Sequence, residues 1–451
     1  MRDIFVLIFI IAGVFASIGG GPFYALLFYL WNAYFRPQEW VFTGWVASLR
    51  LSYVTAVFVP VAMVLWAQPP RFSRWLVTPL LFVAACGLST MESDYSALAQ
   101  PFYFEFLRVG FIAYLISVLA NDIRRVRLVM VTIAFSLGFE AIKQGFAQMI
   151  LNPGAANRNP IAFLGDNNGV ALGMLSLMTI FIALAQTSTG KWERIIYRVG
   201  AIGVCYRGIS TYSRGAFVAA AALALFYMAY SKNRFRSLLG IAVLCGLVLP
   251  VMPTEFWDRM QTITADESDR DASANDRVHL WSVALRMAQS SPLTGVGFNS
   301  FRYAYDVFEP TAEEGQEKAP HSSWFGVLAE IGVPGLILYT LTLGQTYYLA
   351  RRAKRLSRDS PIQRDVHAFA TSLQGSILVV VVGGTFLHVQ YAEMLWHLFG
   401  LSIALESVAS TATVAAGAPQ PAGHAPGPSP AMTPAMATGP KAGPWQASRE
   451  R

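Results

Sequence analysis

Charged residues are scarce in this sequence of 451 residues. Only 14% are Asp, Glu, Lys or Arg, against about 25% in an ordinary soluble domain, whereas 54% are hydrophobic. Apolar runs of about 17 to 25 residues, long enough to cross about 30 Å of hydrocarbon, recur from Ile4 to Ala409. So many runs exclude a soluble globular core, and they predict an all-α polytopic membrane protein.

Cysteine is rarer still, and its positions argue against a disulfide-stabilised protein and against a zinc protein. Cys86, Cys205 and Cys245 each fall within an apolar run, without paired or metal-ligand spacing. They predict packing residues rather than a structural disulfide or a zinc site. The Lys and Arg residues behind the net charge of +7 stand in short clusters between apolar runs, which is typical of membrane topology and not of a nucleic-acid partner.

These basic clusters set the predicted topology, because the cytoplasmic loops of membrane proteins are enriched in Lys and Arg. With the clusters in the cytoplasm, we predict crossings at about 51–67, 75–91, 104–121, 128–150, 168–186, 195–211, 214–231, 237–252, 323–350, 368–387 and 391–410.

The first apolar stretch, residues 4–35, is interrupted by Gly19-Gly20-Gly21-Pro22 and predicts either one bent crossing or a short hairpin. One net crossing there brings the total to about twelve and places both ends in the cytoplasm. A hairpin would place the N-terminus outside. No small-residue cleavage site follows Met1-Arg2-Asp3, so we expect a retained membrane segment rather than a signal peptide.

The C-terminal end has a different composition. From Thr411 onward Ala, Pro, Gly and Thr dominate, and such a segment cannot bury enough apolar surface to fold. We therefore predict a membrane domain over residues 1–410 and a disordered cytoplasmic tail over 411–451. No sequence repeat relates the two halves of the membrane domain, which argues against a carrier.

The long polar segment from Pro253 to Ser323 predicts an external loop over residues 253–322. It contains Gly295 and Gly297, which indicate a tight turn, and it delivers His321 to the start of the next apolar run. A histidine with a reference pKa of about 6.5 is able to accept a proton near neutral pH. The alternative is a helix-capping or interfacial histidine.

Two arginines are predicted on the same side. Arg214 lies in the polar turn Thr211-Tyr212-Ser213-Arg214-Gly215, beside helix N-terminal amides that also favour anions. Arg277 is predicted to open an amphipathic helix with Val278, Trp281 and Leu285 on one face. The alternatives are a snorkelling anchor for Arg214 and a surface salt bridge for Arg277.

Five further residues are candidate cavity-lining groups near the external boundary. Ionisable groups inside a membrane segment are functional candidates by default, although Glu140 and Lys143, three residues apart, are also placed to pair with each other. The five are Lys143, Glu140, Asp166, Asn167 and Tyr212.

Together these patterns resemble the O-antigen ligase superfamily, and most closely its branch of O-glycosylation ligases associated with the exosortase system. The resemblance covers most of residues 1–405 in order. It rests on Gly165-Asp166-Asn167-Asn168, Thr211–Gly215, Arg277–Trp281, and His321-Ser322-Ser323 through Gly335.

The resemblance implies an inverting, metal-independent glycosyltransferase of the bacterial inner membrane, with its active site facing the periplasm and without a cofactor. The donor would be a glycan on undecaprenyl diphosphate, and the acceptor a hydroxyl of an exported protein or of the lipid A-core. By motif position, Arg214 and Arg277 would bind the diphosphate and His321 would activate the acceptor. A lipid-linked glycan polymerase remains the alternative within the superfamily, and a transporter of lipid-linked glycan the alternative outside it.

Overall fold

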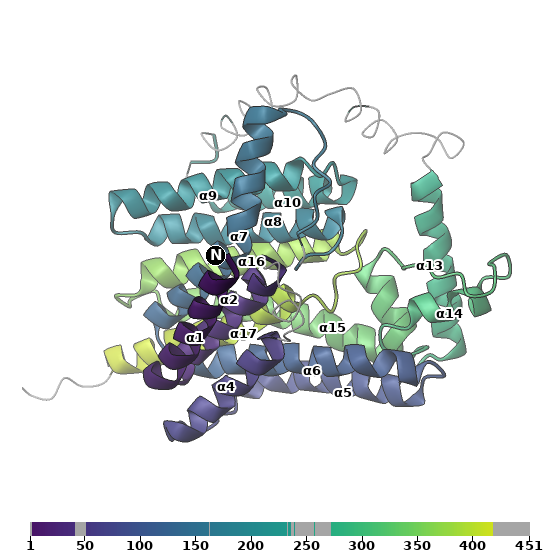
Figure 1. Cartoon of the computed structure of the whole chain (residues 1–451), viewed down its shortest axis with the longest axis horizontal. Helices are drawn as coiled ribbons and strands as arrows, with labels where there is room; N and C mark the ends of the chain where they lie inside the picture. Colours follow the sequence, from purple (N-terminus) through teal and green to yellow (C-terminus); the bar gives the residue numbers. More distant parts are fainter. Residues whose placement is uncertain are drawn as a thin grey trace, which may run out of the picture.

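The computed structural model describes residues 2–40, 51–161, 163–231, 233–235, 239, 257 and 272–417 (Figure 1). These residues are mainly helical and contain no strand, only an isolated bridge between Ile161 and Gly165. The predicted all-α fold is confirmed. The predicted crossing at 237–252 lies outside the described residues except for residue 239, and so do Cys245 and the chain after residue 417.

The N-terminal apolar stretch folds as a helical hairpin. Helix α1 (Arg2–Gly20) and α2 (Pro22–Phe35) meet at Gly21, whose φ of 91° is a left-handed conformation that favours glycine. The two helices pack in antiparallel order, since Phe9 of α1 lies against Trp31 of α2 with ring centroids 4.9 Å apart. Of the two alternatives for residues 4–35, the structure adopts the hairpin.

The rest of the described chain forms long helices joined by short connections. Their bounds are η1 (Pro37–Trp40), α4 (Leu51–Leu65), η2 (Arg74–Leu76), α5 (Val77–Glu92), α6 (Ser96–Leu119), α7 (Ile123–Leu151), α8 (Asn167–Thr187), α9 (Lys191–Ile209), α10 (Arg214–Tyr230), α13 (Ala272–Ser290), α14 (Phe301–Phe308), α15 (Ser323–Leu356), α16 (Gln363–Gly383) and α17 (Glu393–Gly417). Helix α17 thus continues seven residues past the predicted end of the last crossing at residue 410.

Five helical stretches in the described part of the chain are long and apolar enough to cross a membrane. They are Arg74–Glu92, Ser96–Leu119, Asn167–Thr187, Ser323–Leu356 and Gln363–Gly383. Shorter apolar helices are Val6–Ser17, Leu51–Leu65 and Arg214–Tyr230. This set supports a multi-pass membrane protein, and the total of about twelve crossings stays a prediction.

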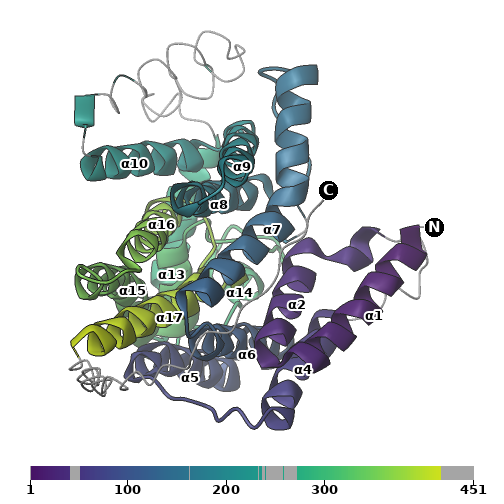
Figure 2. The same cartoon turned by 90° about the vertical axis from the view of Figure 1, so that its left-hand side faces the viewer.

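The helices pack in layers, with α8, α9 and α10 on one side of α15, α16 and α17, and α5 and α6 on the other (Figure 2). Hydroxyl groups join the central helices, because Thr179 of α8 lies 2.9 Å from Ser372 Oγ and 2.8 Å from Ser376 Oγ of α16. Such interhelical hydrogen bonds stabilise helix pairs where lipid offers no competing partner.

Helices α13 and α14 lie beyond one end of this bundle, beside the tips of α5 and α6 (Figure 1). Ser93, at the α5–α6 tip, donates a 2.7 Å hydrogen bond to the carbonyl oxygen of Val296. The predicted apolar face of α13 is wrong: Val278 is 58% exposed and Leu285 44% exposed. The buried face is instead formed by Leu280, Val283, Ala284, Met287 and Ala288.

The start of α13 also differs from the prediction, since the helix begins at Ala272 and Arg277 lies in its second turn. The apolar residues of this helix allow two alternative buried faces, which are related by a small rotation about the helix axis. The contacts of α13 with α14 and α15 select the face that includes Leu280 and Met287.

Candidate functional site

Arg214 is the first residue of α10. The turn before it is held by side chains: Thr211 Oγ1 donates to the carbonyl oxygen of Gly208 at 2.7 Å, and Ser213 Oγ caps the helix by accepting from the amide of Ala216 at 3.4 Å. Arg214 therefore stands at the helix N-terminus, as the sequence predicted. Unpaired amides there favour an anion.

Tyr212 is buried and adopts a positive φ of 54° in this turn. Its hydroxyl donates to the carbonyl oxygen of Gly154, in the connection between α7 and α8. Tyr212 is thus a residue that holds the connection against the turn, and its predicted role in lining a cavity stays a prediction.

Arg207 is a residue of this region that sequence reasoning missed. It is fully buried in the last turn of α9. Its Nε donates to Gln144 Oε1 at 2.7 Å, and its Nη atoms donate to the carbonyl oxygens of Asn157 and Asn159. The sequence feature that could have identified Arg207 is its position as a charged residue inside the predicted crossing at 195–211.

His321 stands immediately before α15. Ser322 caps this helix, while Ser323 binds the segment after α16: its amide donates to the carbonyl oxygen of Gly384 and its Oγ to that of Leu387, both at 2.7 Å. The capping residue is therefore Ser322, and the helix-capping alternative for His321 does not describe the structure. His321 itself has a positive φ of 45°, held between α14 and α15.

Arg277 interacts electrostatically with both Arg214 and His321. Burial lowers the pKa of Arg277, and the positive charge of Arg214 lowers it further. Burial also lowers the pKa of His321, with the charge of Arg277 as the next cause. Arg277 of α13 is thus coupled both to Arg214 at the start of α10 and to His321 before α15, and the joint action of the three residues stays a prediction.

Asp166 joins the same group. Its negative charge acts on His321 in the opposite direction and partly offsets the lowering of the histidine pKa. As the N-cap of α8 it accepts from the amide of Gly169 at 2.8 Å and from Asn168 Nδ2 at 3.3 Å. Next to it, Asn167 Oδ1 is buried without a hydrogen-bond partner among the described residues.

Glu140 and Lys143 form a pair on α7. Lys143 Nζ lies 2.7 Å from Glu140 Oε2 and 5.2 Å from the ring of Trp40, while Gln144 donates to the other carboxylate oxygen at 3.1 Å. The pairing alternative for these two residues is therefore the one that the structure adopts.

Gly295 and Gly297 form the tight turn that the sequence indicated, with φ values of 69° and 125°. The turn packs on α15, because the amide of Gly297 donates to the carbonyl oxygen of Glu330 at 3.2 Å. A Cβ atom at Gly295 would lie 2.3 Å from the backbone of Glu330. The close approach of this turn to α15 thus explains why residue 295 is glycine, and a phosphate-binding loop is not needed to explain it.

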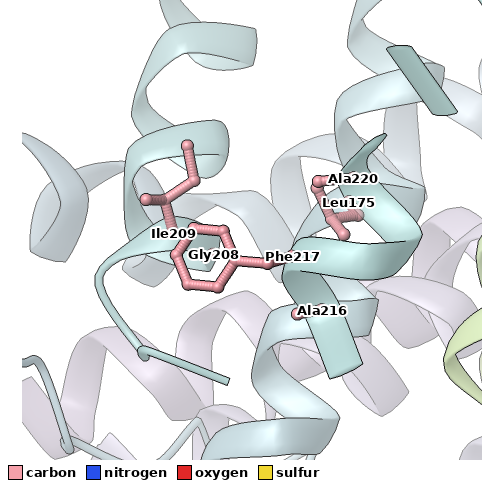
Figure 3. Close-up of a pocket in the computed structure, with 6 residues that line it drawn as sticks. All are labelled: Leu175, Gly208, Ile209, Ala216, Phe217 and Ala220. Carbon is pink, nitrogen blue, oxygen red and sulfur yellow. The ribbon is translucent and has the colours of Figure 1, made fainter. Parts of the chain in front are cut away.

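A partly open apolar pocket lies next to the turn that carries Arg214 (Figure 3). The pocket is small, and it lies between α8, the end of α9 and the first turns of α10. The lining residues are Leu175, Gly208, Ile209, Ala216, Phe217 and Ala220.

Helices α13 and α14 are joined by a buried carboxylate. Glu309 is 4% exposed, and its Oε2 lies 2.7 Å from Arg286 Nη2 and 2.9 Å from His279 Nε2, both on α13. A 2.7 Å hydrogen bond from Thr311 Oγ1 is the main cause that lowers the pKa of Glu309, and the charges of His279 and Arg286 add to it.

We expect Glu309→Gln to loosen α13 and α14 and to remove part of the acid sensitivity of this region. A carboxyl whose pKa is lowered by folding stabilises the folded state above its ordinary pKa, and this contribution is lost as the pH falls through the lowered value. Limited proteolysis from pH 7 to pH 3 would measure the effect. Glu313→Gln, at an exposed position, is the matched control, and equal cleavage of both variants would contradict the prediction.

Comparison with known proteins places these residues in a family context. Residues 199–340 match the family described as O-Antigen ligase, and residues 1–186 match a family of unknown function (DUF5935). A comparison with curated proteins finds no match. Arg214, Arg277 and His321 all lie within the first matched segment, and this match supports the O-antigen ligase superfamily and a membrane glycosyltransferase-like enzyme.

Proposed function

We propose that the protein is a glycosyltransferase that transfers a glycan from undecaprenyl diphosphate to an acceptor hydroxyl at the periplasmic face of the bacterial inner membrane. The observation that carries this proposal is the electrostatic interaction of Arg277 with both Arg214 and His321. Two cations placed close together repel each other, and a dianionic ligand between them would relieve that repulsion.

The arginines would bind and neutralise the diphosphate as it leaves. Each guanidinium presents a planar fork of donors to phosphate oxygens, and Arg214 adds the positive end of the α10 dipole. Charge that develops on the leaving diphosphate is thereby stabilised without a metal ion. Activity that resists a chelator would support this assignment, and strict dependence on an added divalent metal would count against it.

His321 would act as the base. Its lowered pKa leaves the imidazole neutral near pH 7 and able to accept the proton of the acceptor hydroxyl. The hydroxyl oxygen bonds to the anomeric carbon while the bond from that carbon to the diphosphate oxygen breaks, with the electron pair leaving on the diphosphate. A single displacement of this kind inverts the anomeric configuration.

The lipid portion of the donor would lie along the membrane-embedded surface next to Arg214. The apolar pocket between α8, α9 and α10 is adjacent to this arginine, which is consistent with a polyprenyl chain approaching from the bilayer (Figure 3). The acceptor is proposed to be an exported protein or the lipid A-core.

Deletion of the gene would test the proposal. The expected result is loss of glycan from exported proteins or from the lipid A-core, with lipid-linked glycan of normal length accumulating. Shortened lipid-linked glycan would instead identify a repeat-unit polymerase. Normal amounts, lengths and attachment of all three products would contradict the proposed function.

A further inference from the structure

Glu330 is a buried carboxylate close to the candidate site that has no assigned role. It is 1% exposed and lies in the first part of α15, just before the backbone leaves helical geometry at Gly332, where φ is 72°. Burying a charge is costly unless polar groups surround it. Here Tyr391 donates to Oε2 at 2.8 Å, Gln390 to Oε2 at 3.4 Å, and the amide of Phe301 to Oε1 at 3.3 Å.

His388 is the remaining neighbour of this carboxylate. Its Nε2 lies 3.6 Å from Glu330 Oε2, which is an ion-pair distance for a protonated imidazole and is longer than a hydrogen bond. Nε2 is buried and has no hydrogen-bond partner among the described residues, while the side chain as a whole keeps 23% of its surface exposed. One edge of the ring therefore faces the carboxylate and another part reaches accessible space.

The imidazole of His388 also packs against the chain next to His321. A Cβ atom added at Gly326 would lie 3.1 Å from His388 Cδ2 and 3.2 Å from Pro320 Cγ. Pro320 directly precedes His321, and Gly326 lies one turn into α15, so the absence of a side chain at Gly326 allows His388 to approach this turn.

We propose that His388 and Glu330 form an imidazole–carboxylate pair that positions His321 and sets its electrostatic environment. The inference rests on the proposed role of His321 as the proton acceptor. Glu330 holds the ring of His388 in place against the turn that carries His321, and a proton on this ring opposes a proton on His321. His388 is thus a positioning residue that acts through His321.

The charged groups around His321 come from several elements. Arg277 and Asp276 face it from α13, Asp166 from the start of α8, and His388 from the segment after α16. The charges of Arg277 and His388 lower the pKa of His321, after burial as the largest cause, and the two carboxylates raise it. A charge on His388 thus acts in the same direction as the charge of Arg277, against the protonation of His321.

The test measures the protonation of His321 directly, in the full-length protein purified in detergent. Diethyl pyrocarbonate modifies an imidazole only in its neutral form, so mass spectrometry of the modified His321 peptide across a pH series gives the midpoint of its titration. We expect His388→Gln to raise this midpoint by roughly 0.5 pH unit or more, because one opposing charge is removed. His388→Lys, which retains a positive charge, should keep the midpoint near that of the wild type.

His367→Gln is the matched control. His367 lies on α16 and interacts at 3.2 Å with the carbonyl oxygen of Lys354, so its replacement should leave the midpoint unchanged. His388→Asn is a second neutral variant for use if His388→Gln does not keep the wild-type size-exclusion profile. An unchanged midpoint in a folded neutral variant, or a wild-type midpoint at or above the ordinary value of about 6.5, would overturn the proposal.

The same variants have a separate readout in glycan transfer. In His388→Gln, the acid limb of the pH–rate profile should move to higher pH together with the His321 midpoint. If the wild type transfers no glycan but its His321 midpoint responds to His388 as described, the proposed function fails while the pairing stands. If transfer occurs but neither the midpoint nor the acid limb moves, only the pairing fails.

Discussion

Replacing His321 with alanine is expected to reduce glycan transfer by about 10²–10⁴-fold, the range typical for loss of a general base. The variant should still insert into the membrane and bind the lipid-linked donor, because Ser322 and Ser323 make the contacts that fix the start of α15. Transfer would be measured in membranes with lipid-linked glycan and acceptor, and donor binding by copurified lipid diphosphate.

His279→Ala is not a suitable control for this experiment, since His279 is bound to Glu309 and supports the external helices. His367→Ala, on α16, is suitable because it removes a histidine outside the candidate site. Normal transfer by His321→Ala would remove this residue from the mechanism. Loss of donor binding together with transfer would instead assign His321 to the donor site.

Arg277→Ala and Arg214→Ala are expected to slow transfer by about 10²–10³-fold each, as is typical when one donor to a developing negative charge is removed. Both changes should weaken donor binding as well, because the same guanidinium groups bind the diphosphate before transfer. Lysine at either position should rescue only in part, since an ammonium group lacks the planar fork of donors. Donor titration and single-turnover transfer would separate the two effects.

A second consequence follows from the electrostatic coupling of these residues. Because Arg277 lowers the pKa of His321, Arg277→Ala should raise that pKa and move the acid limb of the pH–rate profile to higher pH. Arg302→Ala is the matched control, because Arg302 is a cation of the same external region that stacks 5.3 Å from the ring of Phe102. Normal donor binding and turnover in both Arg214→Ala and Arg277→Ala would refute the diphosphate site.

Local patterns predicted the parts of the site that depend on neighbouring residues in the chain. Arg214 follows the serine that caps α10 and is the first residue of this apolar helix. Asp166 is the N-cap of α8. Each of these features requires only a few consecutive residues. The same is true of the Glu140–Lys143 pair, whose spacing of three residues places both side chains on one helix face.

The residues that sequence reasoning missed depend on partners far away in the chain. Arg207 is satisfied by Gln144, Asn157 and Asn159, and the surroundings of Glu330 include Phe301 and Tyr391. In a single sequence, a charged residue inside an apolar run shows that a partner is needed but does not say which one. The face of α13 was mispredicted for the same reason, since α14 and α15 determine which residues are buried.

The sequence by itself determined that this is a multi-pass helical membrane protein, because the length and low charge of its apolar runs leave few other structures. It also determined which short motifs carry cations and a histidine. Only the tertiary structure decided that Arg277 interacts with both Arg214 and His321, and that His388, which lies 3.6 Å from Glu330, acts on His321. The physical reason is that electrostatic coupling depends on distance in space, which helix packing sets and which separation along the chain does not.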